Sequence, residues 1–203
     1  MRRGKLKLNF ETVDLALIIN GAWETVRLAA EAKSIEIILK LDAEVGEVKG
    51  DSNRLQQIFC NLLSNAIKFT PAEGRVEVSL STVCGQEKQT DGKSYAQIAV
   101  SDTGQGISPE FLPYVFEYFR QADSSTTRSA GGLGLGLAIV RNLTQLHGGT
   151  ISAESPGEGQ GATFTVRLPL VEKSRKANKQ RYKTREINQN SCLKSVKILV
   201  VDD

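Results

Sequence analysis

The spacing of apolar residues over the first 170 positions changes repeatedly between the period of a helix and the period of a strand. Helical spacing is found in three segments, residues 12–34, 51–69 and 133–147. Strand-like patterns are found in five segments, residues 35–41, 75–82, 95–101, 150–154 and 162–168. Helices interspersed among strands that cluster late predict an α/β or α+β fold, in which helices cover one face of a sheet.

The net charge of +3 hides an uneven distribution along the 203 residues. The first nine residues carry +4 and residues 172–190 carry +5, so residues 10–171 carry −6. A nucleic-acid-binding domain would be expected to have a basic face on its folded part, whereas here the basic residues lie in the flanks. The 40% of hydrophobic residues is too high for a disordered chain, yet no apolar run reaches the ~18–20 residues that span a bilayer. We therefore expect that this segment contacts neither nucleic acid nor membrane.

The cysteine and histidine content argues against disulfides and against zinc. Three cysteines, Cys60, Cys84 and Cys192, are an odd number without CxxC spacing, and His147 is the only histidine. Residues 1–10 are basic and lack the apolar core of a secretory signal peptide. A reducing, cytoplasmic setting fits these features, although missing segments could attach the parent protein to a membrane.

The character of the chain changes after residue 170. Residues 171–194 are charged and polar with almost nothing to bury, which is typical of a linker. Residues 195–203 combine a basic residue, an apolar run and the pair Asp202 and Asp203. This pattern predicts a buried parallel strand with carboxylates at its tip, the first strand of a second domain.

One face of the second predicted helix carries Asn61, Asn65 and Lys68, spaced so that they align along one side. Two amide oxygens and an ammonium suit a magnesium-bound polyphosphate, because Mg²⁺ keeps most of its waters and lysine meets phosphate as a point charge. The alternative is that this polar stripe of Asn61, Asn65 and Lys68 is simply the exposed face of a helix. Taken without other evidence, the stripe favours this simpler interpretation.

Three glycine-containing segments follow. Residues 102–107 (Asp-Thr-Gly-Gln-Gly-Ile) come directly after a strand, where an aspartate can accept a hydrogen bond from an exocyclic amine such as that of adenine; an ordinary turn is the alternative. In residues 131–137, alternating glycines leave backbone N–H groups available at the start of a helix, and such groups attract phosphate. The segment matches neither a Walker A loop nor the dinucleotide fingerprint. Residues 159–163 precede the last strand and could equally be a hairpin turn.

Taken together and in this order, these segments resemble the ATP-binding domain of sensor histidine kinases, in the GHKL superfamily. Residues 61–70 look like its N box, residues 102–107 like its G1 box and residues 116–119 like its F box. Residues 132–137 look like its G2 box and residues 159–163 like its third glycine box. The resemblance covers residues 11–170. The resemblance implies a two-layer α/β sandwich with a mixed five-stranded sheet and three helices on one face. Residues 195–203 are similar to the first strand of a receiver domain, as in hybrid histidine kinases.

The resemblance also implies a function and a set of site residues. Asn65 would bind Mg²⁺, Asn61 and Lys68 would act at the phosphates, Asp102 would bind the adenine amine, and Thr163 would lie near adenine through a water. The lid, residues 117–131, could reach the triphosphate with Arg120, Gln121 or Arg128. The implied ATP-binding residues are Asn61, Asn65, Lys68, Asp102, Gly104, Gly106, Ile107, Phe119, Arg128, Gly132, Leu133, Gly134, Leu135, Gly136, Leu137 and Thr163.

Two features bear on the reaction type. Hydrolytic relatives of the gyrase type have a glutamate where this chain has Asn61, and an amide cannot take a proton from water. The family's phosphoacceptor histidine lies on a dimeric helical hairpin before the ATP-binding domain. Nothing here resembles that hairpin, and residues 1–10 look like the end of its connection. We expect γ-phosphoryl transfer to a histidine on that separate hairpin, a monomeric state for the segment alone and no autophosphorylation. The alternatives are a GHKL-type ATPase or protein-serine kinase, and a non-catalytic nucleotide-binding module.

Overall fold

The computed structural model describes residues 7–84, 93–120 and 134–171. In chain order the elements are β1 (Glu11–Val13), α1 (Leu15–Ala32), β2 (Glu36–Leu41), β3 (Val48–Gly50), α2 (Ser52–Phe69), β4 (Arg75–Cys84), β5 (Ser94–Asp102), a short 3₁₀ turn (Leu112–Tyr114), α3 (Gly136–Leu146), β6 (Thr150–Glu154) and β7 (Ala162–Pro169). The expected linker and receiver strand, residues 171–194 and 195–203, lie outside the described residues apart from residue 171, as does most of the N-terminal connection.

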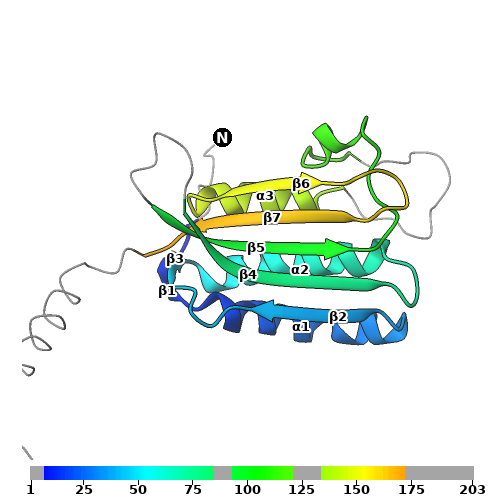
Figure 1. Ribbon diagram of the computed structural model, residues 1–203. Coiled ribbons are helices and arrows are strands. Elements are labelled where there is room, and N and C mark those ends of the chain that lie inside the picture. Colours follow the sequence, from blue (N-terminus) through cyan, green and yellow to red (C-terminus); the bar gives the residue numbers. More distant parts are fainter. Residues whose placement is uncertain (1–6, 85–92, 121–133, 172–203) are drawn as a thin grey trace, which may run out of the picture. The chain divides into compact units, whose positions relative to one another are not determined.

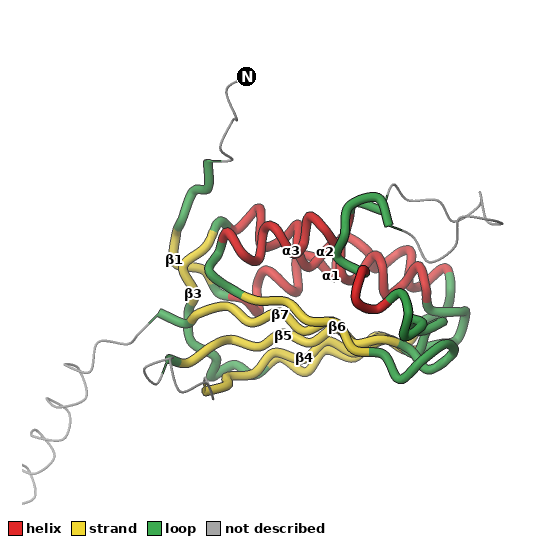
Figure 2. Tube along the Cα trace, turned by 90° about the horizontal axis from the view of Figure 1, so that it is seen from above, coloured by secondary structure: helices red, strands yellow, loops and turns green. Residues whose placement is uncertain are grey.

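The larger sheet has five strands in the order β2-β4-β5-β7-β6. The β2–β4 pair is parallel and the other three pairs are antiparallel, so the sheet is mixed. The three helices lie together on one face of this sheet, and Figure 2 shows the resulting two layers edge-on (Figures 1 and 2). The expected two-layer α/β sandwich with three helices on one face is therefore confirmed.

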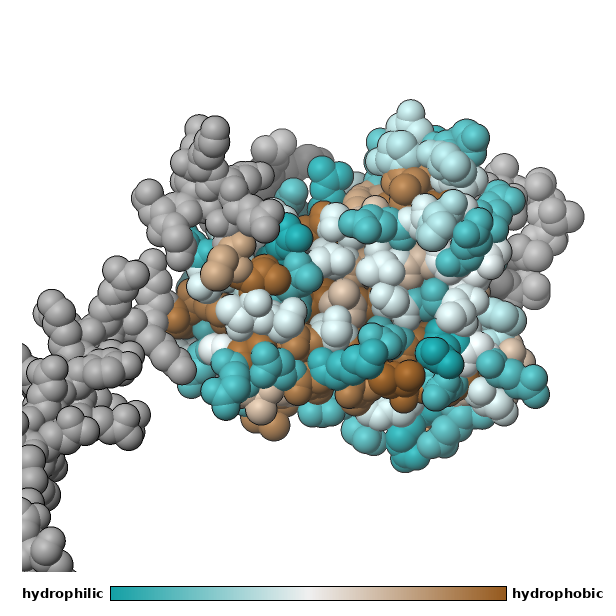
Figure 3. All heavy atoms as spheres, viewed as in Figure 1, coloured by the Kyte–Doolittle hydropathy of each residue, from teal (hydrophilic) through white to brown (hydrophobic). Residues whose placement is uncertain are grey.

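The core forms between the inward face of the sheet and the buried stripes of the helices. On β5, the inward residues Ala96, Ile98 and Val100 are almost fully buried, and the residues between them are half-buried. This alternation follows from the two-residue period of a strand. The opposite face of the sheet is open, and Figure 3 shows it as a mixture of hydrophilic and near-neutral side chains with a few hydrophobic ones between them. Any site on the helix side of the sheet therefore has to lie at an end of the two layers, where the core stops.

The helix boundaries follow local signals in the sequence. Asp14 caps α1 through its carboxylate, which accepts hydrogen bonds from the amides of Ala16 (2.8 Å) and Leu17 (3.4 Å). Asp51 caps α2 in the same way through the amide of Arg54 (3.1 Å). The third helix begins at Gly136 rather than at residue 133, because Gly134 has a left-handed φ of 66° that cannot belong to a helix.

Two strands were not expected from the sequence. β1 and β3 form a separate two-stranded antiparallel sheet, in which Val13 pairs with Val48. Each strand has three residues, which is too short to show a period. Among the described residues, no helix is both long and apolar enough to cross a lipid bilayer.

Candidate nucleotide-binding site

Asp102 is the last residue of β5 and lies at the end of the sheet where β7 begins. It faces the helix side, in phase with the buried Val100 two residues earlier. Its carboxylate accepts a hydrogen bond from the amide of Gly104 (2.9 Å), and the side chain is half-buried. Burial is the largest influence and raises the pKa of the Asp102 carboxyl above its usual value, while hydrogen bonds from the Gly104 and Ala162 backbones oppose that rise. The charged form is thus held at a cost in free energy, as expected for a group kept to bind a ligand.

The raised pKa leads to a prediction for the nucleotide-free protein. The folded state binds the Asp102 proton more tightly than the unfolded state, so ionisation of this group destabilises the fold at pH 7. Asp102→Asn retains an oxygen for the Gly104 amide and carries no charge. We expect this variant to have a higher Tm than wild type at pH 7. The difference should shrink as the pH falls through the raised pKa and vanish well below 3.8, the ordinary pKa of an aspartate, where the carboxyl is protonated in both the folded and the unfolded state. A lower Tm for Asp102→Asn throughout this range, measured by circular dichroism, would contradict the prediction.

The loop after Asp102 is packed tightly against two other segments. Gly104 has no room for a side chain, because a Cβ there would overlap the carbonyl oxygen of Phe69 at the end of α2. The Gly104 carbonyl in turn accepts a hydrogen bond from the amide of Gly161 (3.1 Å). Gly106 has a φ of 67°, and a Cβ there would overlap the Gly157 carbonyl. Ile107, half-buried against the core, donates its amide to Ser155 Oγ (3.0 Å).

The polar stripe of α2 faces the start of α3. Asn65 is half-buried, and its Nδ2 lies 3.7 Å from where a Cβ would stand on Gly136, the first residue of α3. Asn61 is also half-buried, one turn earlier on the same side of the helix. Lys68 is exposed, and its ammonium lies 4.7 Å from the centre of the Phe69 ring. The structure therefore brings one N-box amide, that of Asn65, to the G2-box residue Gly136.

The N-terminus of α3 is not capped by the side chain of its N-cap residue. Its N-cap residue, Leu135, makes no side-chain hydrogen bond to the helix, so the first amides of α3 have no side-chain cap. Leu137 packs against the core and fixes the first turn. Such a helix start attracts anions.

The segments that flank the lid are bonded to each other. Phe119 donates its amide to the Gly134 carbonyl (3.1 Å), and both residues have left-handed φ values, 62° and 66°. The Phe119 side chain is 73% exposed. Arg120 is paired with Glu117 (3.1 Å) and lies 5.2 Å from the Tyr114 ring centre. The other residues predicted in the lid, Gln121 and Arg128, lie outside the described residues, as do Gly132 and Leu133 of the G2 box.

The structure does not bring Thr163 to the Asp102 carboxylate. Thr163 Oγ1 is hydrogen-bonded to Ser101 Oγ (2.9 Å), and both belong to the face of the sheet that points away from the helices. The residue paired with Asp102 across the strands is Ala162, which is buried and in phase with it. The strand period of two places neighbouring residues on opposite faces, so the hydroxyl lies one position away from the side that the nucleotide would occupy.

His147 is not available as a phosphoacceptor. It is buried, Nε2 accepts a hydrogen bond from the Asp51 amide (3.0 Å), and Nδ1 lies 2.7 Å from the Leu143 carbonyl oxygen. A ring that accepts at Nε2 and donates at Nδ1 is neutral. The histidine thus joins the end of α3 to the start of α2.

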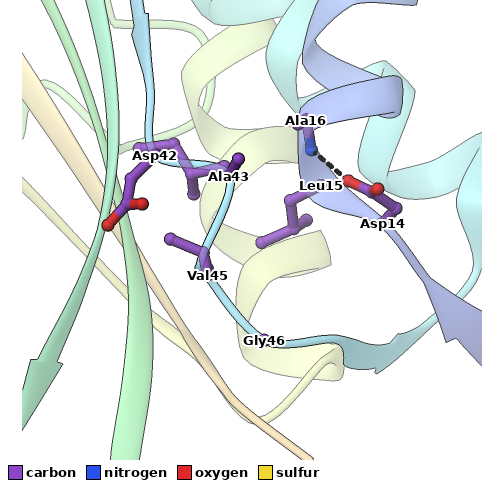
Figure 4. Close-up of a pocket in the computed structure, with 8 residues that line it drawn as sticks. Asp14, Leu15, Ala16, Asp42, Ala43, Val45 and Gly46 are labelled. Carbon is purple, nitrogen blue, oxygen red and sulfur yellow. Dashed lines mark hydrogen bonds between the residues drawn. The ribbon is translucent and has the colours of Figure 1, made fainter.

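A separate pocket lies at the opposite end of the sheet. It is lined by Asp14, Leu15, Ala16, Asp42, Ala43, Val45, Gly46 and Leu80 (Figure 4). The Asp14 carboxylate is used by the α1 cap, and Asp42 accepts the amide of Glu44 (2.9 Å). None of the expected site residues lines this pocket.

The family model described as "Histidine kinase-, DNA gyrase B-, and HSP90-like ATPase" matches residues 50–172, which contain all of the elements around Asp102. The chain belongs to this family. Among its relatives, a hybrid signal transduction histidine kinase D of Dictyostelium discoideum is 38% identical over 84% of this chain and 12% of its own length. The autoinducer 2 sensor kinase/phosphatase LuxQ of Vibrio parahaemolyticus is 35% identical over 100% of this chain and 23% of its own length.

Solved structures of histidine kinases have the same fold. The mycobacterial sensor histidine kinase MprB matches with a TM-score of 0.64 and 33% identity, over 79% of this chain and 97% of that one. Full-length ShkA in complex with AMPPNP matches with a TM-score of 0.67 and 32% identity, over 81% of this chain and 32% of that one. This histidine kinase-type ATP-binding domain thus corresponds to nearly all of the MprB chain, but spans only 12–23% of the two multidomain relatives.

Several residues that shape the site carried no sequence signal. Ser155 holds the loop after Asp102 through its hydroxyl, which also donates to the Gly161 carbonyl (2.7 Å). The Phe69 carbonyl accepts the amide of Gln105 (3.1 Å). The side of the sheet that Ala162 faces could have been predicted from the sequence, by following the alternation of Phe164, Val166 and Leu168 back by two residues.

Proposed function

We propose that this domain binds Mg·ATP between α2, α3 and the end of β5, and presents the γ-phosphoryl group to a histidine on a separate helical hairpin. One observation carries the proposal: the last turns of α2 contact both the loop after Asp102, through Phe69, and the start of α3, through Asn65. The Asp102 carboxylate suits an amine donor and the start of α3 suits an anion, which are the two ends of ATP.

The adenine end of the proposed site is built on the loop after Asp102. Its carboxylate accepts the exocyclic amine, and the absence of side chains on Gly104 and Gly106 lets this loop pack directly against the Phe69 and Gly157 carbonyls. Ala162 lies on the same face as Asp102 and leaves space beside it. Thr163 supports this strand from the other face through Ser101.

The phosphate end is built on α3. The amides that follow Gly134 and Leu135 point toward the phosphates, and Lys68 supplies a positive charge from α2. We propose Phe119 and Arg128 from the lid, and Gly132 and Leu133 from the G2 box, as further contacts by analogy with the family. Catalysis in this arrangement is mainly positioning and charge stabilisation.

The residues present fit a magnesium ion that is held mostly by phosphate and water. The described residues contain no cluster of three His, Cys, Asp or Glu that could enclose a metal, while the half-buried Asn65 has one amide oxygen to offer. Mg²⁺ typically takes one or two protein oxygens beside substrate phosphates. When bound, the ion would neutralise charge on the phosphates, and Asn65 would orient it.

We expect slow ATP hydrolysis, because Asn61 stands where hydrolytic relatives have a glutamate as general base, and an amide cannot take a proton from water. A positioned base contributes about 10²–10⁴-fold to such a step, so phosphate release by the isolated domain should be about a hundredfold slower than transfer to a competent hairpin. The test compares the rate of phosphate release by the isolated domain with the rate at which an added hairpin is labelled from radioactive ATP. Equal rates in the two reactions would support a GHKL-type ATPase instead.

The proposal is tested by calorimetry with Mg·ATP, followed by radiolabelled ATP and an added hairpin that bears a histidine. Asn65→Ala should lower the Mg²⁺-dependent part of the affinity about tenfold, whereas the exposed Asn142→Ala on α3 should match wild type. Binding with label on the hairpin supports a kinase domain. Binding without transfer would indicate a nucleotide module only, and no binding would overturn the proposal.

The surrounding architecture is also a proposal. The names of the relatives support a hybrid kinase, in which a histidine-bearing dimerisation hairpin connects through residues 1–10 to the ATP-binding domain, residues 11–170. A linker, residues 171–194, would then lead to a receiver domain that starts at residues 195–203. We propose a cytoplasmic location for this segment and a monomeric state when it is isolated.

A further inference from the structure

The C-terminal end of α2 is held by groups from two other parts of the chain. Lys33 Nζ donates to the carbonyls of Ile67 (2.8 Å), Lys68 (2.9 Å) and Thr70 (2.9 Å). The remaining carbonyl, that of Phe69, accepts the amide of Gln105 (3.1 Å). The last carbonyls of a helix have no partner within the helix, so these four are satisfied entirely from outside α2.

Lys33 is well placed for this role. An ammonium has three protons, and here each has a carbonyl partner. The residue is the C-cap of α1, and its own carbonyl accepts the amide of Glu73 in the turn after α2 (3.1 Å). Both its backbone and its side chain therefore connect α1 to the end of α2. Its positive charge also offsets the negative partial charge of the helix end, which a polyanionic nucleotide nearby would otherwise meet.

The end of α2 fixes the geometry of the proposed nucleotide site. Lys68 lies in this last turn, and the Phe69 carbonyl holds Gln105 and approaches Gly104 so closely that no Cβ would fit. The loop that begins at Asp102 is thus positioned against the turn that Lys33 holds.

We propose that Lys33 is a positioning residue for nucleotide binding. It does not touch the nucleotide; it keeps the last turn of α2 in place, so that Lys68 and the loop after Asp102 face the ligand in one arrangement. This inference rests on the proposed binding of Mg·ATP at that site.

The test compares Lys33→Met, which keeps the aliphatic stem, with Lys33→Arg, which keeps the charge and the donors. Lys40→Met is the matched control, because Lys40 is exposed and pairs with Glu77 on the surface (2.8 Å). The first readout is amide hydrogen exchange of Gln105 in nucleotide-free protein, relative to the amide of Ile98 in the centre of the sheet. The second is affinity for Mg·ATP by calorimetry, at a temperature where all variants are folded.

Loss of bonds from a charged donor should make Gln105 exchange about tenfold faster relative to Ile98 and weaken Mg·ATP binding about tenfold in Lys33→Met. Lys33→Arg should recover part of both effects, and Lys40→Met should show neither. A Lys33→Met protein with a lower Tm but with wild-type Gln105 exchange and affinity would overturn the inference, because Lys33 would then serve stability alone.

The two readouts separate this inference from the function on which it rests. If the wild-type protein does not bind Mg·ATP, the proposed function fails, and Gln105 exchange still decides whether Lys33 positions the loop. If Lys33→Met does not fold, Lys33→Gln is measured in the same way, since it removes the charge and keeps a shorter donor.

Discussion

Asp102→Ala is expected to lower the affinity of this domain for Mg·ATP by about a hundredfold, because a hydrogen bond to a charged, half-buried acceptor contributes about 1.5–3 kcal/mol. The same change leaves the Gly104 amide without its acceptor at 2.9 Å, so the loop proposed to contact adenine also loses its hydrogen bond to the end of β5. Calorimetry with Mg·ATP measures the effect. An affinity within threefold of wild type would mean that the carboxylate is not the adenine contact.

A change of nucleotide makes this prediction more specific. Inosine triphosphate has a carbonyl where ATP has the amine, so the wild-type carboxylate should reject it strongly. In Asp102→Asn, the side-chain NH₂ can donate a hydrogen bond to that carbonyl, while the side-chain oxygen still accepts a hydrogen bond from the Gly104 amide. The preference for ATP over the inosine nucleotide should therefore shrink or reverse in Asp102→Asn. Equal loss of both nucleotides would indicate that Asp102 acts on loop structure rather than on base recognition.

Gly161→Ala is expected to be the most damaging single methyl addition in the described part of the site. Gly161 has a φ of 73°, and a Cβ there would overlap the carbonyl oxygen of Asp102. Backbone atoms cannot move aside as a flexible side chain does, so the strand pair must separate at the site. We expect a loss of about 3 kcal/mol or more, which corresponds to a fall in Tm of about 6–12 °C for a domain of this size.

Gly159→Ala provides the matched control. Gly159 has nearly the same φ, 74°, but nothing lies within 4 Å of the position that a Cβ would take. The left-handed conformation alone should cost about 1 kcal/mol. Thermal unfolding of both variants separates the cost of the left-handed backbone from the cost of the overlap with the Asp102 carbonyl. Equal falls in Tm for the two variants would show that this overlap is unimportant.

The elements with strong local signals could be predicted from the sequence. α2 begins after the Asp51 cap and ends at Thr70-Pro71, as its pattern indicated, because a capping carboxylate and a proline act on neighbouring residues. The nucleotide-site prediction came from the order of short glycine-containing segments, and the structure brings Asn65 to Gly136.

Features that depend on distant contacts could not be predicted in this way. Lys33 contacts residues that lie 34 to 37 positions later in the chain, and no local pattern marks such a partner. Thr163 was assigned through its motif, whereas the side of the sheet that it faces depends on the strand register with Ser101. Periodicity gives the spacing of residues in an element, but the phase of one strand against another is set by the assembled sheet.

The strand order has a consequence for the synthesis of the protein. β7 is the last strand of the described part of the chain, yet it lies inside the sheet between β5 and β6. While a ribosome is still translating the residues before Ala162, β5 has an unpaired edge and β6 has no neighbour, so the sheet cannot close from its N-terminal end. Nascent chains that stall before this strand would expose an edge suited to pairing with other chains, and would be natural clients for chaperones.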